Sequence, residues 1–82
     1  LAQDTDWRVR IDVAENKKTS IETLAMLASD KEWRVRCAVA GNKNAPIEAL
    51  EALSIDNNKL VSETAEEALK ERKEKSKASM KI

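Results

Sequence analysis

The chain has 82 residues and a mass of 9.2 kDa, enough for one small domain or one piece of a larger protein. Its 15 Lys and Arg residues balance 15 Asp and Glu residues, so no net charge draws it toward nucleic acid or an anionic membrane. It has no His and one Cys, which excludes Ser-His and Cys-His nucleophiles, His metal sites and internal disulfides. We therefore predict no catalytic, cofactor-binding or metal-binding residues.

The ends of the chain and its apolar runs indicate its cellular compartment. No run approaches the roughly 18–20 continuous apolar residues of a membrane span, and the N-terminus lacks the basic and apolar regions of a signal peptide. A free thiol and no targeting segment favour the cytoplasm. Because Leu1 rather than Met stands first, we expect a fragment of a longer protein.

An internal repeat is the main feature of the sequence. Residues 4–29 align with residues 30–55 at a constant offset of 26, without a gap, and 13 of the 26 positions are identical. A third copy opens at Asp56 and keeps apolar residues at Val61 and Ala65, but Lys59 stands where the second copy has Trp33. We therefore predict an all-α solenoid of two 26-residue repeats, 4–29 and 30–55, followed by a divergent capping helix and basic tail over 56–82.

Each repeat reads as two short helices, the first of which starts near its Trp. Asp4 or Asp6 can cap the N-terminus of this helix in the first repeat. Asn16 and Asn42 follow its last apolar residue in the two copies, where Asn tolerates a left-handed backbone conformation. We therefore expect these two residues to end the helices in that conformation.

The second helix of each repeat is predicted to begin at Ser20 or at Pro46. Proline at a first helical position loses no hydrogen bond, because that N–H has no partner within the helix. An apolar stripe at helical spacing follows in each copy, formed by Ile21, Leu24 and Leu27, and by Ile47, Leu50 and Leu53. We expect both stripes to be buried between stacked repeats.

The last segment differs from the rest in length and charge. No loop signal follows Asn58, so the sequence predicts one helix from about residue 58 into the seventies. The apolar face of this helix consists of Leu60, Val61, Ala65, Ala68 and Leu69. Residues 1–69 carry a net charge of −4 and residues 70–82 a net charge of +4. We expect the Lys-rich end to be a solvated extension.

The run VRCAVAGNKNAPIEALEALSID, residues 35–56, resembles the leucine-rich repeat variant family. Units of that family read roughly V-R-x-A-V-A-x-N-P-x-T-P-x-E-x-L-x-x-L-A-x-D, and residues 9–30 follow the same spacing. Lys17 and Lys43 stand where the family favours its first Pro, and Ser20 stands at the second. The resemblance implies a right-handed superhelix of short helices without a sheet. The Asp-x4-Val-Arg element that opens each copy is also similar to HEAT-like repeats, in which the Asp and Arg commonly bond between neighbouring units.

Four arginines are the candidate interaction residues: Arg8, Arg10, Arg34 and Arg36. They recur at equivalent repeat positions, so stacking could align them as a basic ladder that contacts phosphates. The alternative assigns Arg10 and Arg36 to Asp pairs between repeats and leaves Arg8 and Arg34 on the surface. The acidic balance of residues 1–69 favours this alternative.

Trp7 and Trp33, the only aromatic residues, could anchor a partner or pack between repeats. Their recurrence at one repeat position favours packing. Cys37 takes the place of Ile11, so we expect it near the core rather than as a nucleophile.

These observations favour a non-catalytic helical-repeat scaffold or protein-interaction module with a protein partner, and no membrane. The sequence identifies neither that partner nor the oligomeric state. The alternative function is a nucleic-acid-binding HEAT-like repeat that uses the Arg ladder and the Lys-rich C-terminal helix.

Overall fold

The computed structural model describes the backbone of residues 6–80 and the side chains of residues 6–73. Within that part, helices and turns make up the fold and there is no strand, which confirms the predicted all-α class. The five helices are α1 (Trp7–Glu15), α2 (Ile21–Leu27), α3 (Trp33–Gly41), α4 (Ile47–Leu53) and α5 (Lys59–Met80).

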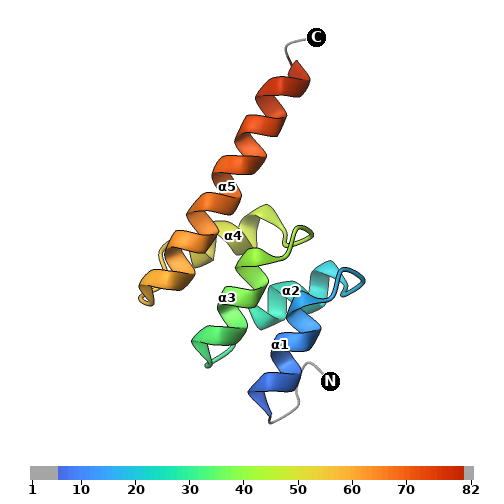
Figure 1. Cartoon of the computed structure of the whole chain (residues 1–82), viewed down its shortest axis with the longest axis vertical. Helices are drawn as coiled ribbons and strands as arrows, with labels where there is room; N and C mark the ends of the chain where they lie inside the picture. The colour runs from blue at the N-terminus through green and yellow to red at the C-terminus, as the bar shows by residue number, and fades with distance from the viewer. Residues whose placement is uncertain (1–5, 81–82) are drawn as a thin grey trace.

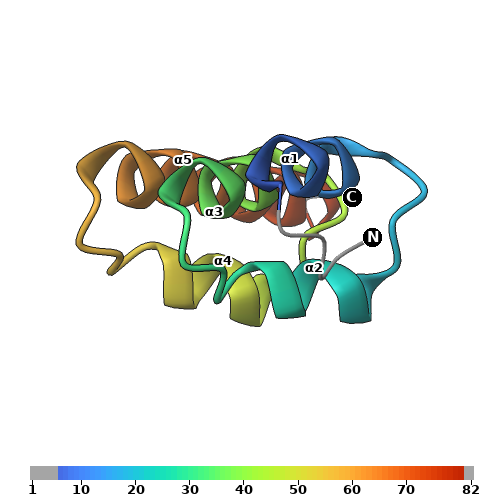
Figure 2. The ribbon, with the colours of Figure 1, turned by 90° about the horizontal axis from the view of Figure 1, so that it is seen from below.

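The helices lie in two layers. α1, α3 and α5 stand side by side in one layer, and α2 and α4 form the other (Figures 1 and 2). α3 is central, because it packs against α1 on one side and against α5 on the other. We call the solvent side of the α1–α3–α5 layer the outer face; it carries the exposed residues Arg8, Arg34, Gly41 and Glu67.

The N-termini of α1, α3 and α5 are capped at positions 26 residues apart. Oδ1 of Asp6 accepts from the Arg8 amide at 2.9 Å, and a Glu32 carboxylate oxygen accepts from the Arg34 amide at 3.4 Å. Asn58 Oδ1 accepts from the Leu60 and Val61 amides at 2.9 and 3.2 Å. Each side chain satisfies amides that the first helical turn leaves without a partner.

The caps of α2 and α4 correct the predicted starts by one residue. Ser20 and Pro46 are the N-caps rather than the first helical residues, and both have extended backbone angles. Ser20 Oγ accepts from the Thr23 amide at 3.2 Å, whereas Pro46 makes no side-chain cap.

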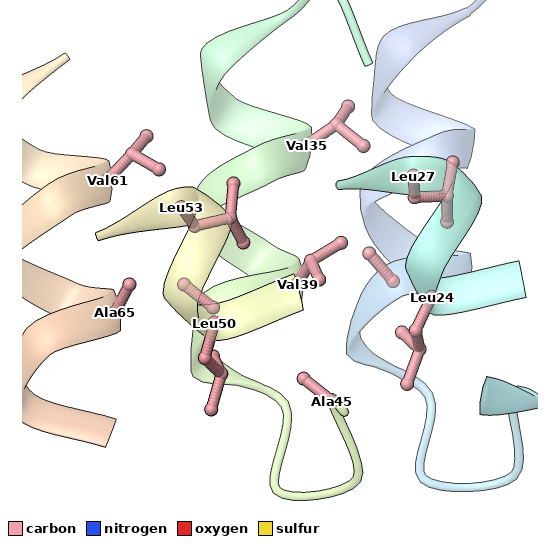
Figure 3. Close-up of a cluster of buried hydrophobic side chains, with 11 residues drawn as sticks. Leu24, Leu27, Val35, Val39, Ala45, Leu50, Leu53, Val61 and Ala65 are labelled. Carbon is pink, nitrogen blue, oxygen red and sulfur yellow. The ribbon is translucent and has the colours of Figure 1, made fainter. Parts of the chain in front are cut away.

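The core fills the space between the two layers (Figure 3). Leu24 and Leu27 of α2 insert between α1 and α3, and Leu50 and Leu53 of α4 insert between α3 and α5. All four are at most 2% exposed, as predicted. Val35 and Val39 of α3, with Val61 and Ala65 of α5, complete this core.

Three residues of the predicted apolar stripes lie outside the core. Ile21 is 59% exposed, Ile47 is 41% exposed and Leu60 is 52% exposed. Ile21 and Ile47 are the first residues of their helices, where the chain enters from the surface, so only the residues one and two turns further on reach the space between the layers.

The predicted left-handed conformation of Asn16 and Asn42 is wrong. Their φ angles are −73° and −80°, and no residue of the described backbone has a positive φ. Instead each Oδ1 accepts from the amide two residues on, Lys18 or Asn44, at 2.8 Å. Asn is therefore used for its side-chain hydrogen bonds, which close the turn after the helix.

The terminal helix runs from Lys59 to Met80, in agreement with the prediction of one long helix. α5 packs on α3 and α4 over its first half and extends past the other helices (Figure 1). The side chains after Lys73 and residues 81–82 lie outside the described part, so the predicted solvated extension stays a prediction.

Candidate interaction surface

Two of the four candidate arginines form ion pairs between successive helices. Arg10 Nε donates to Asp30 Oδ2 at 2.6 Å, and Arg36 Nε donates to Asp56 Oδ2 at 2.7 Å; each Nη2 donates to the other carboxylate oxygen at 3.1 Å. Arg36 also donates to the Asp30 backbone carbonyl at 2.8 Å. The four residues therefore form one line of bonds from α1 to the start of α5, the Asp–Arg arrangement that was the alternative prediction.

Geometry and burial make these pairs strong. Both are bidentate, and the side chains are mostly buried, with 7% exposure for Arg10 and 10% for Asp56. Burial acts to raise the pKa of Asp30, but hydrogen bonds from Arg10 and from the Glu32 amide outweigh it and lower that pKa below its usual range. The Arg36 hydrogen bond lowers the pKa of Asp56 against a smaller effect of burial.

A second set of bonds covers backbone carbonyls at the helix C-termini. Asn42 is 8% exposed, and its Nδ2 donates to the carbonyls of Ala14 at 2.7 Å and Asn16 at 3.1 Å. Asn44 Nδ2 donates to the Lys17 carbonyl at 2.7 Å. These bonds join the turn after α3 to the end of α1.

The third copy makes the equivalent connection with a different residue. Ala68 stands 26 positions after Asn42 and has no amide to donate. Arg72, one turn further along α5, donates from Nη2 to the Lys43 carbonyl at 2.7 Å and from Nη1 to the Ala45 carbonyl. Lys43 is the repeat equivalent of Lys17, so at this carbonyl the guanidinium takes the place of the Asn44 amide.

The other two candidate arginines lie on the outer face. The Arg8 side chain is 75% exposed and pairs with Asp6 at 3.2 Å. Arg34 pairs with Glu32 at 2.8 Å, and its guanidinium carbon lies 5.0 Å from the Trp7 ring centre and 4.8 Å from that of Trp33. Arg34 therefore sits between both indoles in cation–π contact, with half of its side chain open to solvent.

The two tryptophans pack against the core and also contact an exposed cation. Both are partly buried and pack against the core, as the packing interpretation predicted. Both rings also contact the exposed guanidinium of Arg34, and we call this group of Trp7, Arg34 and Trp33 the platform. Cys37 likewise packs against the core, and its Sγ lies 3.8 Å from Thr64 Oγ1.

Two grooves run between the helices of this layer. The groove between α1 and α3 has a volume of about 420 Å³ and is bordered by Ile11, Glu15, Trp33, Arg34 and Cys37. The groove between α3 and α5 has a volume of about 480 Å³. Gly41 borders both, and a Cβ on it would meet nothing within 4 Å.

Sequence reasoning missed Asn42, Arg72 and Gly41. Asn42 was assigned to the backbone of a helix end, although its recurrence with Asn16 was a signal that a side-chain bond could repeat. Arg72 was counted only as part of a basic tail. Gly41, the one Gly of the chain, gave no signal in the sequence, because its place at the border of both grooves depends on the two helices beside it.

The described residues add one finding on metal binding and one on membrane spanning. No group of three or more Cys, Asp or Glu side chains among them is placed to hold a metal ion. In the same part of the chain, no helix has both the length and the apolar character to cross a bilayer.

Comparison with known proteins identifies the repeat. Residues 33–56 match the family model described as Leucine rich repeat variant, and this confirms the resemblance found in the sequence. No curated protein and no solved structure matches the chain significantly. The match spans α3, α4 and the turn that ends at Asp56, and α3 within it packs against α1 on one side and against α5 on the other. Residues 33–56 are thus similar to a repeat of the leucine rich repeat variant family, and they lie within a stack of helices.

Proposed function

We propose that this chain is a non-catalytic helical-repeat scaffold that binds protein partners through the outer face of α1, α3 and α5. Residues 4–29 and 30–55 are its two repeats, and residues 56–82 are a divergent capping unit. The observation that carries the proposal is the platform of Trp7, Arg34 and Trp33 beside the groove between α1 and α3. Trp and Arg are the residues most enriched where protein interfaces gain their affinity.

The contacts within the fold favour this function over nucleic-acid binding. Arg10 and Arg36 are mostly buried and bonded to carboxylates, so neither guanidinium is presented to a phosphate. Arg72 is bonded to two carbonyls. Of the proposed basic ladder, Arg8 and Arg34 are exposed, and each pairs with a carboxylate two residues away.

Affinity capture with matched charge variants tests the proposal. Arg34→Glu reverses the charge on the platform, and Lys31→Glu makes the same change in the turn before α3, outside both grooves. A partner should be retained by the parent protein and by Lys31→Glu, and lost from Arg34→Glu. A partner that both variants retain would show that another surface binds it.

A DNA titration tests the alternative. We expect no change in tryptophan fluorescence with single-stranded or duplex DNA at about 50 or 200 mM salt. Binding that is strong at the lower salt and collapses at the higher one would instead assign phosphate contacts to this chain.

A further inference from the structure

The groove between α3 and α5 has an apolar floor and an acidic wall. Small residues of both helices form the floor, including Ala40, Gly41 and Ala68, and Leu60 at one end is half exposed. Glu63, Glu67 and Glu71 follow one another at four-residue intervals along α5 and line the same groove. On a helix this spacing sets successive residues on one side, about 6 Å apart along the axis.

Among residues 6–73, whose side chains the structure describes, the charges of this wall are largely unmatched. Glu63 lies 3.9 Å from Lys59, and both side chains are exposed, so that pair is weak. Glu67 and Glu71 have no ion pair among the described residues. Arg72 borders the groove, but its guanidinium is bonded to the carbonyls of Lys43 and Ala45. An occupant of this groove must therefore bring positive charge.

The chain itself contains a helical segment of that charge. Residues 70–82 carry a net charge of +4, and α5 continues as a helix to Met80, past the ends of α3 and α4 (Figure 1). If two α5 helices lie antiparallel and centred on Arg72, position 67 faces position 77 and position 70 faces position 74. In each of these pairs a Glu of one helix lies opposite a Lys of the other. On each side of Arg72, this register therefore brings two pairs of opposite charges together.

We propose that a second copy of this chain docks here, with the Lys-rich end of its α5 lying antiparallel along the acidic groove between α3 and α5. The exchange is reciprocal, because each copy offers one groove and one basic helix end. The inference rests on the proposed function in placing binding on the outer face, and it names the occupant of one groove. Exposed ion pairs contribute little each and are screened by salt, so the dimer is weak and sensitive to ionic strength.

Sedimentation of the whole chain at increasing concentration tests the proposal, with Gly41 as the site of change. Gly41 has open space around its Cβ position and an ordinary negative φ, so a long side chain fits there without disturbing the fold. Gly41→Lys adds positive charge to the groove and Gly41→Glu adds negative charge, with similar bulk. We expect Gly41→Lys to raise the dimer dissociation constant about fivefold and Gly41→Glu to lower it about fivefold, since each dimer contains the change twice.

Ionic strength provides the second comparison. Raising the salt from about 50 to 500 mM should raise the dissociation constant of the parent chain about tenfold. A chain that stays monomeric at all concentrations, or a dimer that responds equally to Gly41→Lys and Gly41→Glu, would overturn the proposal. Either result would leave the capture experiment with Arg34→Glu unaffected, so the two proposals fail separately.

Discussion

The contact between α1 and α3 and the contact between α3 and α5 each contain an Arg–Asp ion pair of the same kind. They differ in the side chains that donate hydrogen bonds to the backbone carbonyls at the helix ends. Asp30 and Asp56 bind Arg10 and Arg36 with nearly identical geometry. The carbonyls at the helix ends are instead covered by Asn42 and Asn44 in the first contact and by Arg72 in the second. The difference shows that the ion pair depends on positions near the helix starts, whereas the longer helix α5 bonds the Lys43 carbonyl, the equivalent of that of Lys17, with another residue.

Arg36→Ala should break the second contact and have the largest effect. It leaves the buried Asp56 carboxylate without its partner and removes the bond to the Asp30 carbonyl, so we expect the free energy of unfolding to fall by about 3 kcal/mol. The matched control is Arg34→Ala in the same helix, which removes an exposed pair and should cost about 1 kcal/mol or less. Urea unfolding of both variants measures this; equal losses would contradict the distinction between buried and exposed arginines.

Acid should weaken both contacts together. Asp30 and Asp56 have lowered pKa values in the fold, so the folded state binds their protons less tightly than the unfolded chain does. Their stabilising effect is therefore complete above the unfolded pKa near about 4 and is lost as the pH falls through the lower folded values. Urea unfolding between about pH 7 and pH 2 should show a plateau and then a decline, whereas stability that rises on acidification would contradict the role of these pairs.

Asn42→Ala should weaken the first contact alone. It removes two bonds to buried carbonyls of the preceding helix end, so we expect a loss of about 2 kcal/mol in the free energy of unfolding. Asn16→Ala is the repeat-equivalent control, because Asn16 is exposed and its side chain accepts from the Lys18 amide without bonding a neighbouring helix; it should cost about 0.5 kcal/mol. Thermal or urea unfolding that gives the reverse order would show that the amide bonds of Asn42 do not hold α3 to α1.

The smallest expected effect is a gain. Gly41→Ala should raise the free energy of unfolding by about 0.5 kcal/mol, because Gly41 ends α3 with an ordinary backbone and an added methyl group meets only open space. A loss of stability measured by urea unfolding would mean that the groove at Gly41 is narrower than described.

The repeat made much of the fold predictable. The 26-residue offset located the helix pairs, and helical spacing selected Leu24, Leu27, Leu50 and Leu53 for the core. Asp and Arg recur at the same offset, and the resemblance to HEAT-like repeats implied that they bond between neighbouring units. Repetition helps because an interaction between adjacent units must occur wherever its residues recur.

Features that depend on how the helices lie relative to one another were not predictable from the repeat. The exposure of Ile21 and Ile47 follows from where each short helix begins, which the apolar spacing does not specify. The guanidinium of Arg34 contacts two tryptophans from different helices, and the groove beside it forms only once α1 and α3 are aligned. Local sequence patterns contain no information on such distances between helices.

The most direct test of this account is the solvent exchange of the four arginine Nε–H groups, followed in ¹H–¹⁵N NMR spectra of the parent chain. The structure predicts slow exchange for Arg10 and Arg36, whose Nε–H groups are held by mostly buried carboxylates, and fast exchange for Arg8 and Arg34. Four groups that all exchange rapidly would contradict the account, because the arginines at the helix contacts would then be as open to solvent as those on the outer face.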